Sequence, residues 1–194
     1  MKKVIVLVAV CFMIISGIFA HKLQQGFRVG FLFPIVSVDQ FSGFTVKTAT
    51  IVGISLDYSL KIPLTEKFTM VTGAGYHNFS FETEIIDNDI VYSTNELHFT
   101  GLSVPAGIGY SLTRSCSVYG QASIFFLLNA SNKYGDDIKE LYNGTWYSVK
   151  GGVTYNITET MFADLNYSHV IGDIRIDPPE ITLGLINLSI GLFF

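Results

Sequence analysis

The sequence predicts an all-β fold: an eight-stranded antiparallel up-and-down transmembrane β-barrel with a filled polar lumen. Apolar and polar residues alternate with period two over most of the chain. The mean hydropathy is +0.43 and only 14 % of residues are charged, yet beyond the N-terminal segment no apolar run reaches the roughly 20 residues of a membrane helix. Long and short connectors also alternate, as expected when hairpins turn tightly on one side of a membrane and loosely on the other.

The N-terminal segment predicts a secretory signal peptide over residues 1–20, removed before a barrel over 21–194. It combines a short basic start (MKK), the apolar run 4–19 and a small residue at the cleavage point. Two alternatives were weighed. A retained anchor helix is disfavoured because the run is at the lower length limit for spanning. A lipid-modified Cys11 is disfavoured because Val10, which precedes it, is not small.

Charge and cysteine content exclude some classes of partner and crosslink. Without Lys2 and Lys3, the mature chain has ten basic and sixteen acidic residues, a formal net charge of −6. This balance disfavours nucleic acid as a partner, because phosphate binding requires clustered Lys and Arg. Cys116 is the one cysteine after the signal peptide, so no intramolecular disulfide is expected, and it is interpreted as a small hydrophobe in a strand.

The alternation defines eight segments and seven connectors. The predicted strands lie near residues 26–36, 48–60, 66–79, 95–110, 115–129, 144–156, 160–172 and 180–194. The long or polar connectors are 37–47, 80–94, 130–143 and 173–179, and the short ones are 61–65, 111–114 and 157–159. An even number of strands places both ends of the barrel on the side of the short turns.

The last strand shows which face of each strand is expected to meet lipid. Leu188, Ile190 and Leu192 alternate with Asn187 and Ser189, and successive strand residues point to opposite faces. No charged residue stands mid-strand on the apolar face. A water-soluble barrel places its charges outside, so this arrangement predicts apolar side chains facing hydrocarbon and polar ones facing the lumen.

Aromatic residues mark the turn end of the predicted barrel. Tyr58, Tyr110 and Tyr155 each close an even-numbered strand on its apolar face just before a short turn, and Phe27 and Phe194 fall at the same level. Aromatic girdles occupy this position at the lipid–water boundary. The alternative is that these are ordinary strand tyrosines, since tyrosine favours strands in any sheet.

Four charged residues are predicted to lie inside the barrel as two ion pairs. If Phe27 faces Tyr58, then Arg28 faces Asp57 across the first two strands. A turn centred near residue 157 sets Lys150 opposite Asp164. Pairing would offset the cost of burying each charge. The alternative is that each charge meets water or another partner.

The second long connector is acidic and contains no basic residue. Residues 82–96 carry Glu82, Glu84, Asp87, Asp89 and Glu96. Carboxylate oxygens bind Ca²⁺ or Mg²⁺, and such an ion could bridge to lipopolysaccharide phosphates. The spacing fits no defined calcium loop, however, so a solvated acidic loop is the competing interpretation. No cofactor and no defined metal site are predicted.

Four stretches carry a resemblance to a known family: GFRVGFLFP, DYSLKIPLTEKF, LSVPAGIGYSL and the terminal NLSIGLFF. They resemble the small outer-membrane β-barrels of Bacteroidetes, the PorT-like or porin-family barrels, which share the architecture of OmpA- and OmpX-like proteins. The resemblance implies a Gram-negative outer-membrane location and a monomer in contact with outer-membrane lipid and lipopolysaccharide. The terminal Phe194 resembles the signal by which the barrel-assembly machinery recognises a last strand.

The predicted function is a structural, binding or adhesion role carried by extracellular loops. An eight-stranded barrel is filled by its side chains, so an open pore is not expected. A secretion-assisting barrel and a narrow channel are the alternatives. Some small outer-membrane barrels modify lipid A with a Ser/His pair, and Ser168 and His169 lie near the loop end, with His98 at the top of the fourth strand. Period two sets Ser168 and His169 on opposite faces, so no enzymatic activity is predicted.

Overall fold

The structure, a computed structural model, describes residues 23–38, 45–87, 90–176 and 180–194. The predicted signal peptide, residues 1–20, lies outside the described residues. Among the described residues, no helix is long and apolar enough to cross a bilayer. The elements are β1 (Gln24–Val38), β2 (Thr45–Pro63), β3 (Phe68–Asp87), β4 (Ile90–Ser111), β5 (Cys116–Asn132), the short 3₁₀ helix η1 (Lys139–Leu141), β6 (Thr145–Asn156), β7 (Met161–Ile171) and β8 (Ile181–Phe193).

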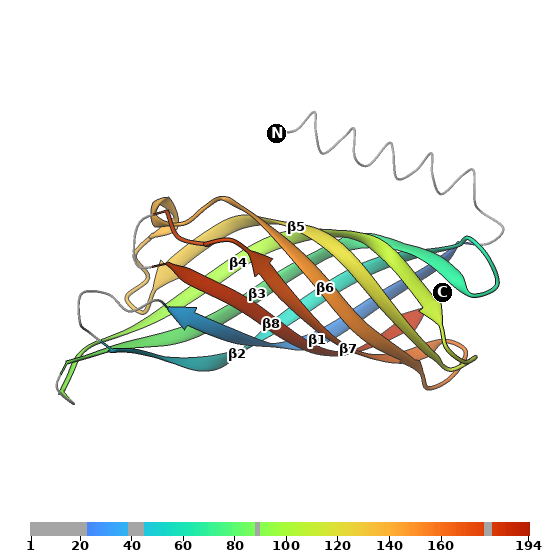
Figure 1. The fold of residues 1–194 in the computed structure, drawn as a ribbon, viewed down its shortest axis with the longest axis horizontal. Coiled ribbons are helices and arrows are strands. Elements are labelled where there is room, and N and C mark those ends of the chain that lie inside the picture. The colour runs from blue at the N-terminus through green and yellow to red at the C-terminus, as the bar shows by residue number, and fades with distance from the viewer. Residues whose placement is uncertain (1–22, 39–44, 88–89, 177–179) are drawn as a thin grey trace.

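The strands form one closed antiparallel barrel. Each strand pairs with the next in the chain, and β8 pairs with β1 from Gly26↔Phe193 to Val38↔Ile181. Figure 1 shows the strongly tilted strands wrapped around a common axis, with the C-terminus at the same end as the short turns. Closure removes the two free edges that an open sheet would expose to hydrocarbon. The predicted eight-stranded up-and-down barrel is therefore confirmed.

Strands β2, β3 and β4 extend farther than the sequence predicted. β3 has 20 residues and β4 has 22, and they pair from Phe68↔Tyr110 out to Asp87↔Ile90. The prediction of a loop over 80–94 was wrong. Charged residues can continue a strand beyond the bilayer when the neighbouring strand still supplies hydrogen-bond partners, as β3 and β4 do here. Figure 1 shows these three strands projecting beyond the others at the left-hand end, the loop end.

The outer and inner faces of the wall differ as predicted. Leu188, Ile190 and Leu192 are each more than half exposed, at 52, 53 and 53 %, whereas Asn187 and Ser189 between them are buried. The same alternation recurs in β6, where exposed and buried residues take turns along the strand. The outer face therefore presents contiguous apolar side chains, which suits lipid and would be costly in water.

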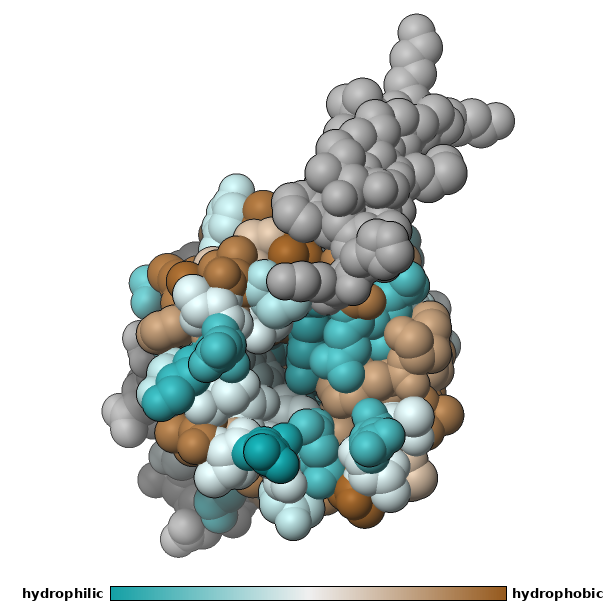
Figure 2. Space-filling model, turned by 90° about the vertical axis from the view of Figure 1, so that its right-hand side faces the viewer, coloured by the Kyte–Doolittle hydropathy of each residue, from teal (hydrophilic) through white to brown (hydrophobic). Residues whose placement is uncertain are grey.

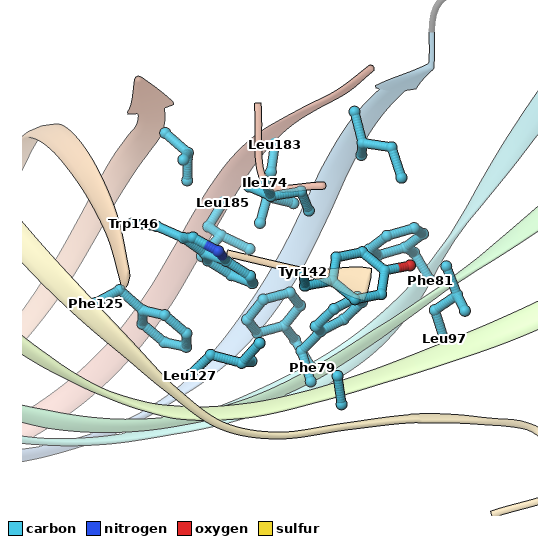
Figure 3. Packing of buried hydrophobic residues seen from close by; sticks show 14 of the residues in the cluster. Phe79, Phe81, Leu97, Phe125, Leu127, Tyr142, Trp146, Ile174, Leu183 and Leu185 are labelled. Atoms are coloured by element: carbon cyan, nitrogen blue, oxygen red, sulfur yellow. The ribbon is translucent and has the colours of Figure 1, made fainter. Parts of the chain in front are cut away.

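The loop-side half of the lumen is apolar, which the sequence analysis did not predict. Figure 3 shows aromatic and aliphatic side chains from several strands meeting inside the barrel. Phe99 stacks on Phe79 and Phe81 with ring centroids 5.6 and 5.3 Å apart, and Phe125 stacks on Trp146 at 4.8 Å. Inward positions of β3 change from polar to aromatic toward the loop end, so the predicted polar lumen holds only for the turn-side half. Even there it is interrupted near the turns, where Phe162 stacks on Phe193 at 4.2 Å.

Two loops cover this aromatic cluster at the loop end. The Tyr142 side chain is 5 % exposed and packs edge-on against Phe99 at 5.0 Å, and Ile174 is fully buried. The two loops are joined by hydrogen bonds from Asn143 N to Ile174 O (2.9 Å) and from Ile176 N to Leu141 O (3.0 Å). Burial raises the pKa of the Tyr142 hydroxyl, consistent with its enclosed position. Among the described residues, these contacts close the lumen at the loop end.

One glycine allows the narrow lumen to hold its charged side chains. A Cβ on Gly75 would overlap Asp57 Oδ1 and would come within 2.6 Å of His77 Nε2 and 2.7 Å of Ser103 Oγ. Glycine in a strand often marks such a close approach. Crowding inside the barrel therefore explains why glycine stands at position 75.

Candidate functional site

The turn-side half of the lumen contains a buried cluster of charges centred on Arg28. Its Nε donates to Asp57 Oδ2 at 3.2 Å, and its Nη1 donates to Asp164 Oδ1 at 3.0 Å. All three side chains are at most one-tenth exposed. The Arg28–Asp57 contact arises from the register Phe27↔Tyr58 and Arg28↔Asp57, which is the register that the sequence analysis assumed.

Asp164 accepts more hydrogen bonds than any simple ion pair requires. Besides Arg28, its carboxylate accepts from Tyr119 Oη (2.8 Å), Thr154 Oγ1 (2.8 Å) and Asn166 Nδ2 (2.7 Å). These donors come from β5, β6 and β7, so with Arg28 of β1 the carboxylate connects four strands. A carboxylate can be buried without a large loss of stability only when its oxygens accept hydrogen bonds, and these four donors supply them.

The predicted Lys150–Asp164 pair does not form. The ladder sets Lys150 opposite Ser168 and Asp164 opposite Thr154. It ends at Asn156↔Phe162, so the hairpin is centred on residue 159 rather than on 157. The shift is an even number of residues, so both side chains still face the lumen. Lys150 is 6 % exposed and interacts with Asp57 and Asp164 only at longer range, without a hydrogen bond or ion pair.

His77, which was not among the predicted site residues, belongs to the same cluster. His77 Nε2 lies 3.3 Å from Asp57 Oδ1 and 2.9 Å from Ser103 Oγ, and the residue is 5 % exposed. Its face could have been read from the alternation of β3. Its partner could not, because that depends on Gly75 standing opposite Asp57.

A polar cavity of about 130 Å³ opens from this cluster toward the turn end. Figure 2, which faces that end, shows hydrophilic side chains around a central hollow. The cavity is lined by Arg28, Asp57, Lys61, Tyr119 and Gln121, among others. Since the described residues close the loop end, the lumen is a cavity that opens toward the turn end and not a channel through the barrel.

The five residues predicted to form an aromatic girdle lie at the turn end of their strands. Phe27, Tyr155 and Phe194 are exposed, at 45, 55 and 72 %. Tyr58 is half-buried and donates to Gln25 Oε1 at 2.7 Å. Tyr110 packs 5.0 Å from the Phe68 ring. Their contact with the membrane boundary remains a prediction.

The acidic segment is part of the projecting β3–β4 hairpin rather than a loop. Glu82 stands directly opposite Glu96, and Glu84 opposite Thr94. Asp87 ends β3, and Asp89 lies outside the described residues. Within the described ranges, no group of three or more His, Cys, Asp or Glu side chains is placed to hold a metal ion. The described part of the hairpin therefore offers no ready-made cation site.

Ser168 and His169 are separated as the sequence analysis predicted. The Ser168 side chain is buried toward the lumen, and His169 is the next residue along β7, with its ring 6.4 Å from that of Tyr167. No contact between Ser168 and His169 exists in the described residues. His98, by contrast, pairs across the ladder with Ser80 on the outer face of the barrel.

The sealed loop end predicts that the barrel does not conduct. Because rings such as Phe99 and Trp146 fill the outer half of the lumen, recordings from planar bilayers should show no steady unitary current. Leakage from an unfolded fraction is controlled by repeating the measurement on Phe99→Ala, which removes one ring from the cluster. A stable wild-type conductance that grows in Phe99→Ala would contradict the closed lumen.

Comparison with known proteins places this architecture. The family model for the outer membrane protein beta-barrel domain matches residues 5–194. The chain belongs to this family. As an outer membrane protein beta-barrel, it is located in the bacterial outer membrane. No curated protein matches the sequence at a significant level.

Solved structures share the fold of this outer membrane protein beta-barrel at low sequence identity. Neisserial surface protein A matches with a TM-score of 0.55 and 16 % identity, covering 88 % of this chain and 97 % of that chain. Ail, the attachment invasion locus protein of Yersinia pestis, matches with a TM-score of 0.51 and 14 % identity over 89 and 99 %. OprG from Pseudomonas aeruginosa matches with 0.51 and 12 % over 89 and 96 %.

Proposed function

We propose that this barrel is a surface protein whose loop end binds a partner outside the cell. The observation that carries the proposal is the construction of that end. Two loops are hydrogen-bonded into a lid over an apolar cluster, and β2, β3 and β4 project beyond the wall. A rigid projecting surface with a sealed lumen beneath it serves contact better than transport.

The charge of the loop end indicates what kind of partner it would accept. Acidic residues outnumber basic ones there. The acidic residues among the described side chains are Glu82, Glu84, Glu96, Asp136, Asp137, Glu140, Asp173 and Glu180, and the basic ones are Lys47, Lys133, Lys139 and Arg175. Complementary charge favours a basic protein surface and speeds encounter with it.

The comparison with Ail provides a contrast in the charge of the bound partner. One Ail structure contains a heparin analogue, sucrose octasulfate, which is a polyanion. The loop end of this chain has the opposite charge preference. A shared fold does not carry a shared ligand, so adhesion to basic protein surfaces, and not to heparin-like polyanions, is the proposed role.

The test is binding of the nanodisc-embedded chain to immobilised polylysine and to heparin. Polylysine should bind and heparin should not. Neutralising the η1 loop with Asp136→Asn, Asp137→Asn and Glu140→Gln together should weaken polylysine binding about tenfold, because each exposed charge pair contributes roughly 0.5 kcal/mol. Salt should weaken it further.

The matched control neutralises carboxylates at the opposite end. Glu66→Gln with Glu159→Gln removes exposed charge from the turns and should leave binding unchanged. Equal losses in the two variants, or binding to heparin, would overturn a specific role for the acidic loop end.

The remaining assignments follow from the sequence. We propose that the chain is a PorT-like barrel of a Gram-negative bacterium of the Bacteroidetes, and that residues 1–20 are removed as a signal peptide. Its apolar outer face would contact outer-membrane lipid and lipopolysaccharide as a monomer, with its last strand presented to the assembly machinery. A secretion-assisting role stays an alternative. The absence of lipid A chemistry at Ser168 and His169 stays a prediction.

A further inference from the structure

Three polar side chains meet on the outer face of β3 and β4 in an order that catalysis uses. Ser80 stands directly opposite His98 in the ladder, and Ser80 Oγ lies 2.7 Å from His98 Nδ1. His98 Nε2 lies 3.5 Å from Glu96 Oε1. Glu96 is two residues from His98 along β4, so both side chains share a face. A nucleophile, a base and a group that orients the base thus lie in a row.

The position of this row relative to the bilayer indicates its substrate. Toward the turn end, β4 presents Leu102 and Val104 to lipid, each 43 % exposed. Asn78 and Thr100 form the next pair outward, and Ser80 and His98 the one after it. The row therefore stands at headgroup level, where the ester bonds of membrane lipids lie. The His98 and Glu96 side chains are 40 and 37 % exposed.

We propose that Ser80, His98 and Glu96 form a serine esterase site that cleaves an acyl ester of an outer-leaflet lipid. The Glu96 carboxylate, 3.5 Å from His98 Nε2, favours the tautomer that carries its proton on Nε2, which leaves the Nδ1 lone pair facing Ser80. Ser80 and His98 are the catalytic residues, and Glu96 is a positioning residue. This activity would replace the prediction that the chain is not an enzyme, and it is independent of the proposed loop-end function.

The chemistry balances with water as the second substrate. Ser80 Oγ bonds to the ester carbonyl carbon while its proton passes to His98 Nδ1. The alkoxy C–O bond then breaks, and His98 returns that proton to the leaving alcohol. Water attacks the acyl-serine with His98 as base, releasing a fatty acid and restoring the Ser80 hydroxyl.

An amide on the bilayer side of Ser80 is the donor assigned to the negative oxygen of the intermediate. Asn78 lies two residues from Ser80 on the same face, toward the bilayer, and its Nδ2 donates one proton to Thr100 Oγ1 at 3.0 Å. Within the described residues, its second N–H has no partner. Ser80 is only 8 % exposed, so an ester has to displace neighbouring side chains of the outer face to reach its hydroxyl.

The direct test is covalent labelling of the full chain, folded in detergent, with a fluorophosphonate probe. Wild type should label, and peptide mass analysis should place the adduct on Ser80. His98→Ala should slow labelling by at least about 100-fold. Glu96→Gln should also slow it, with partial rescue by Glu96→Asp, which a merely structural role would not give. Ser168→Ala is the matched control and should label normally.

The source of the ester is separated by two substrates. Folded wild type is given phospholipid vesicles or purified lipopolysaccharide, and released fatty acid is measured against the His98→Ala variant. Release from either one supports the site and identifies its lipid. No adduct on Ser80 of folded wild type, an adduct indifferent to His98→Ala, or no release from both lipids would overturn the proposal, and the wild-type adduct decides even if variants fold poorly.

Discussion

The Asp164→Ala variant should lose about 3–5 kcal/mol of unfolding free energy, the largest effect expected for any single lumen substitution. Its carboxylate accepts from Arg28, Tyr119, Thr154 and Asn166. Removing it leaves the Arg28 guanidinium half-compensated and several buried donors without an acceptor. Urea unfolding in detergent, followed through the single tryptophan, Trp146, measures the loss.

Two controls separate this network from a general effect of losing a carboxylate. Asp136→Ala removes an exposed loop carboxylate and should change stability by no more than about 0.5 kcal/mol. In a double-mutant cycle, Arg28→Ala and Asp164→Ala together should cost less than the sum of the single losses. Additive losses, or an Asp164→Ala loss as small as that of Asp136→Ala, would show that the cluster does not hold the strands together.

The Leu188→Arg variant should be destabilised by about 2–4 kcal/mol in lipid and should assemble poorly. Leu188 lies mid-strand on the outer face of β8 and is 52 % exposed. A guanidinium there has hydrocarbon and no counter-charge around it. The folded fraction after refolding into lipid vesicles, separated from unfolded chain by its gel mobility without heating, gives the readout.

The matched control is Leu188→Phe, which changes size but keeps the side chain apolar and should fold normally. Arginine is expected to impair folding only where its side chain faces hydrocarbon. Ser115→Arg, in an exposed turn between β4 and β5, should also fold normally. If Leu188→Arg refolds as well as either control, the outer face of β8 does not meet hydrocarbon.

The alternation of residues was enough to predict the barrel and the face of each lumen charge. Arg28 and Asp57 were placed correctly because the aromatic pair Phe27 and Tyr58 fixes their register. For Lys150 and Asp164, alternation placed both inside, but the partner depended on the length of a turn. An error of an even number of residues leaves the face unchanged and moves the partner.

The features that escaped prediction are those that join distant strands. The sequence around Phe79, Phe81 and Phe99 shows apolar residues in strands, but not that they meet Tyr142 and Trp146 inside the barrel. The contact of Ser80 with His98 likewise depends on β3 and β4 continuing as a ladder through a segment whose acidic composition suggested a loop.

The closed barrel with apolar residues outside was predictable from the chain alone, because side-chain alternation along a strand is a local property. The polar contacts required the folded structure: Arg28 meets two carboxylates, and Ser80 lies beside His98 and Glu96. The same holds for the apolar cluster that closes the loop end. Those contacts depend on register and closure, which the whole ring of strands sets together.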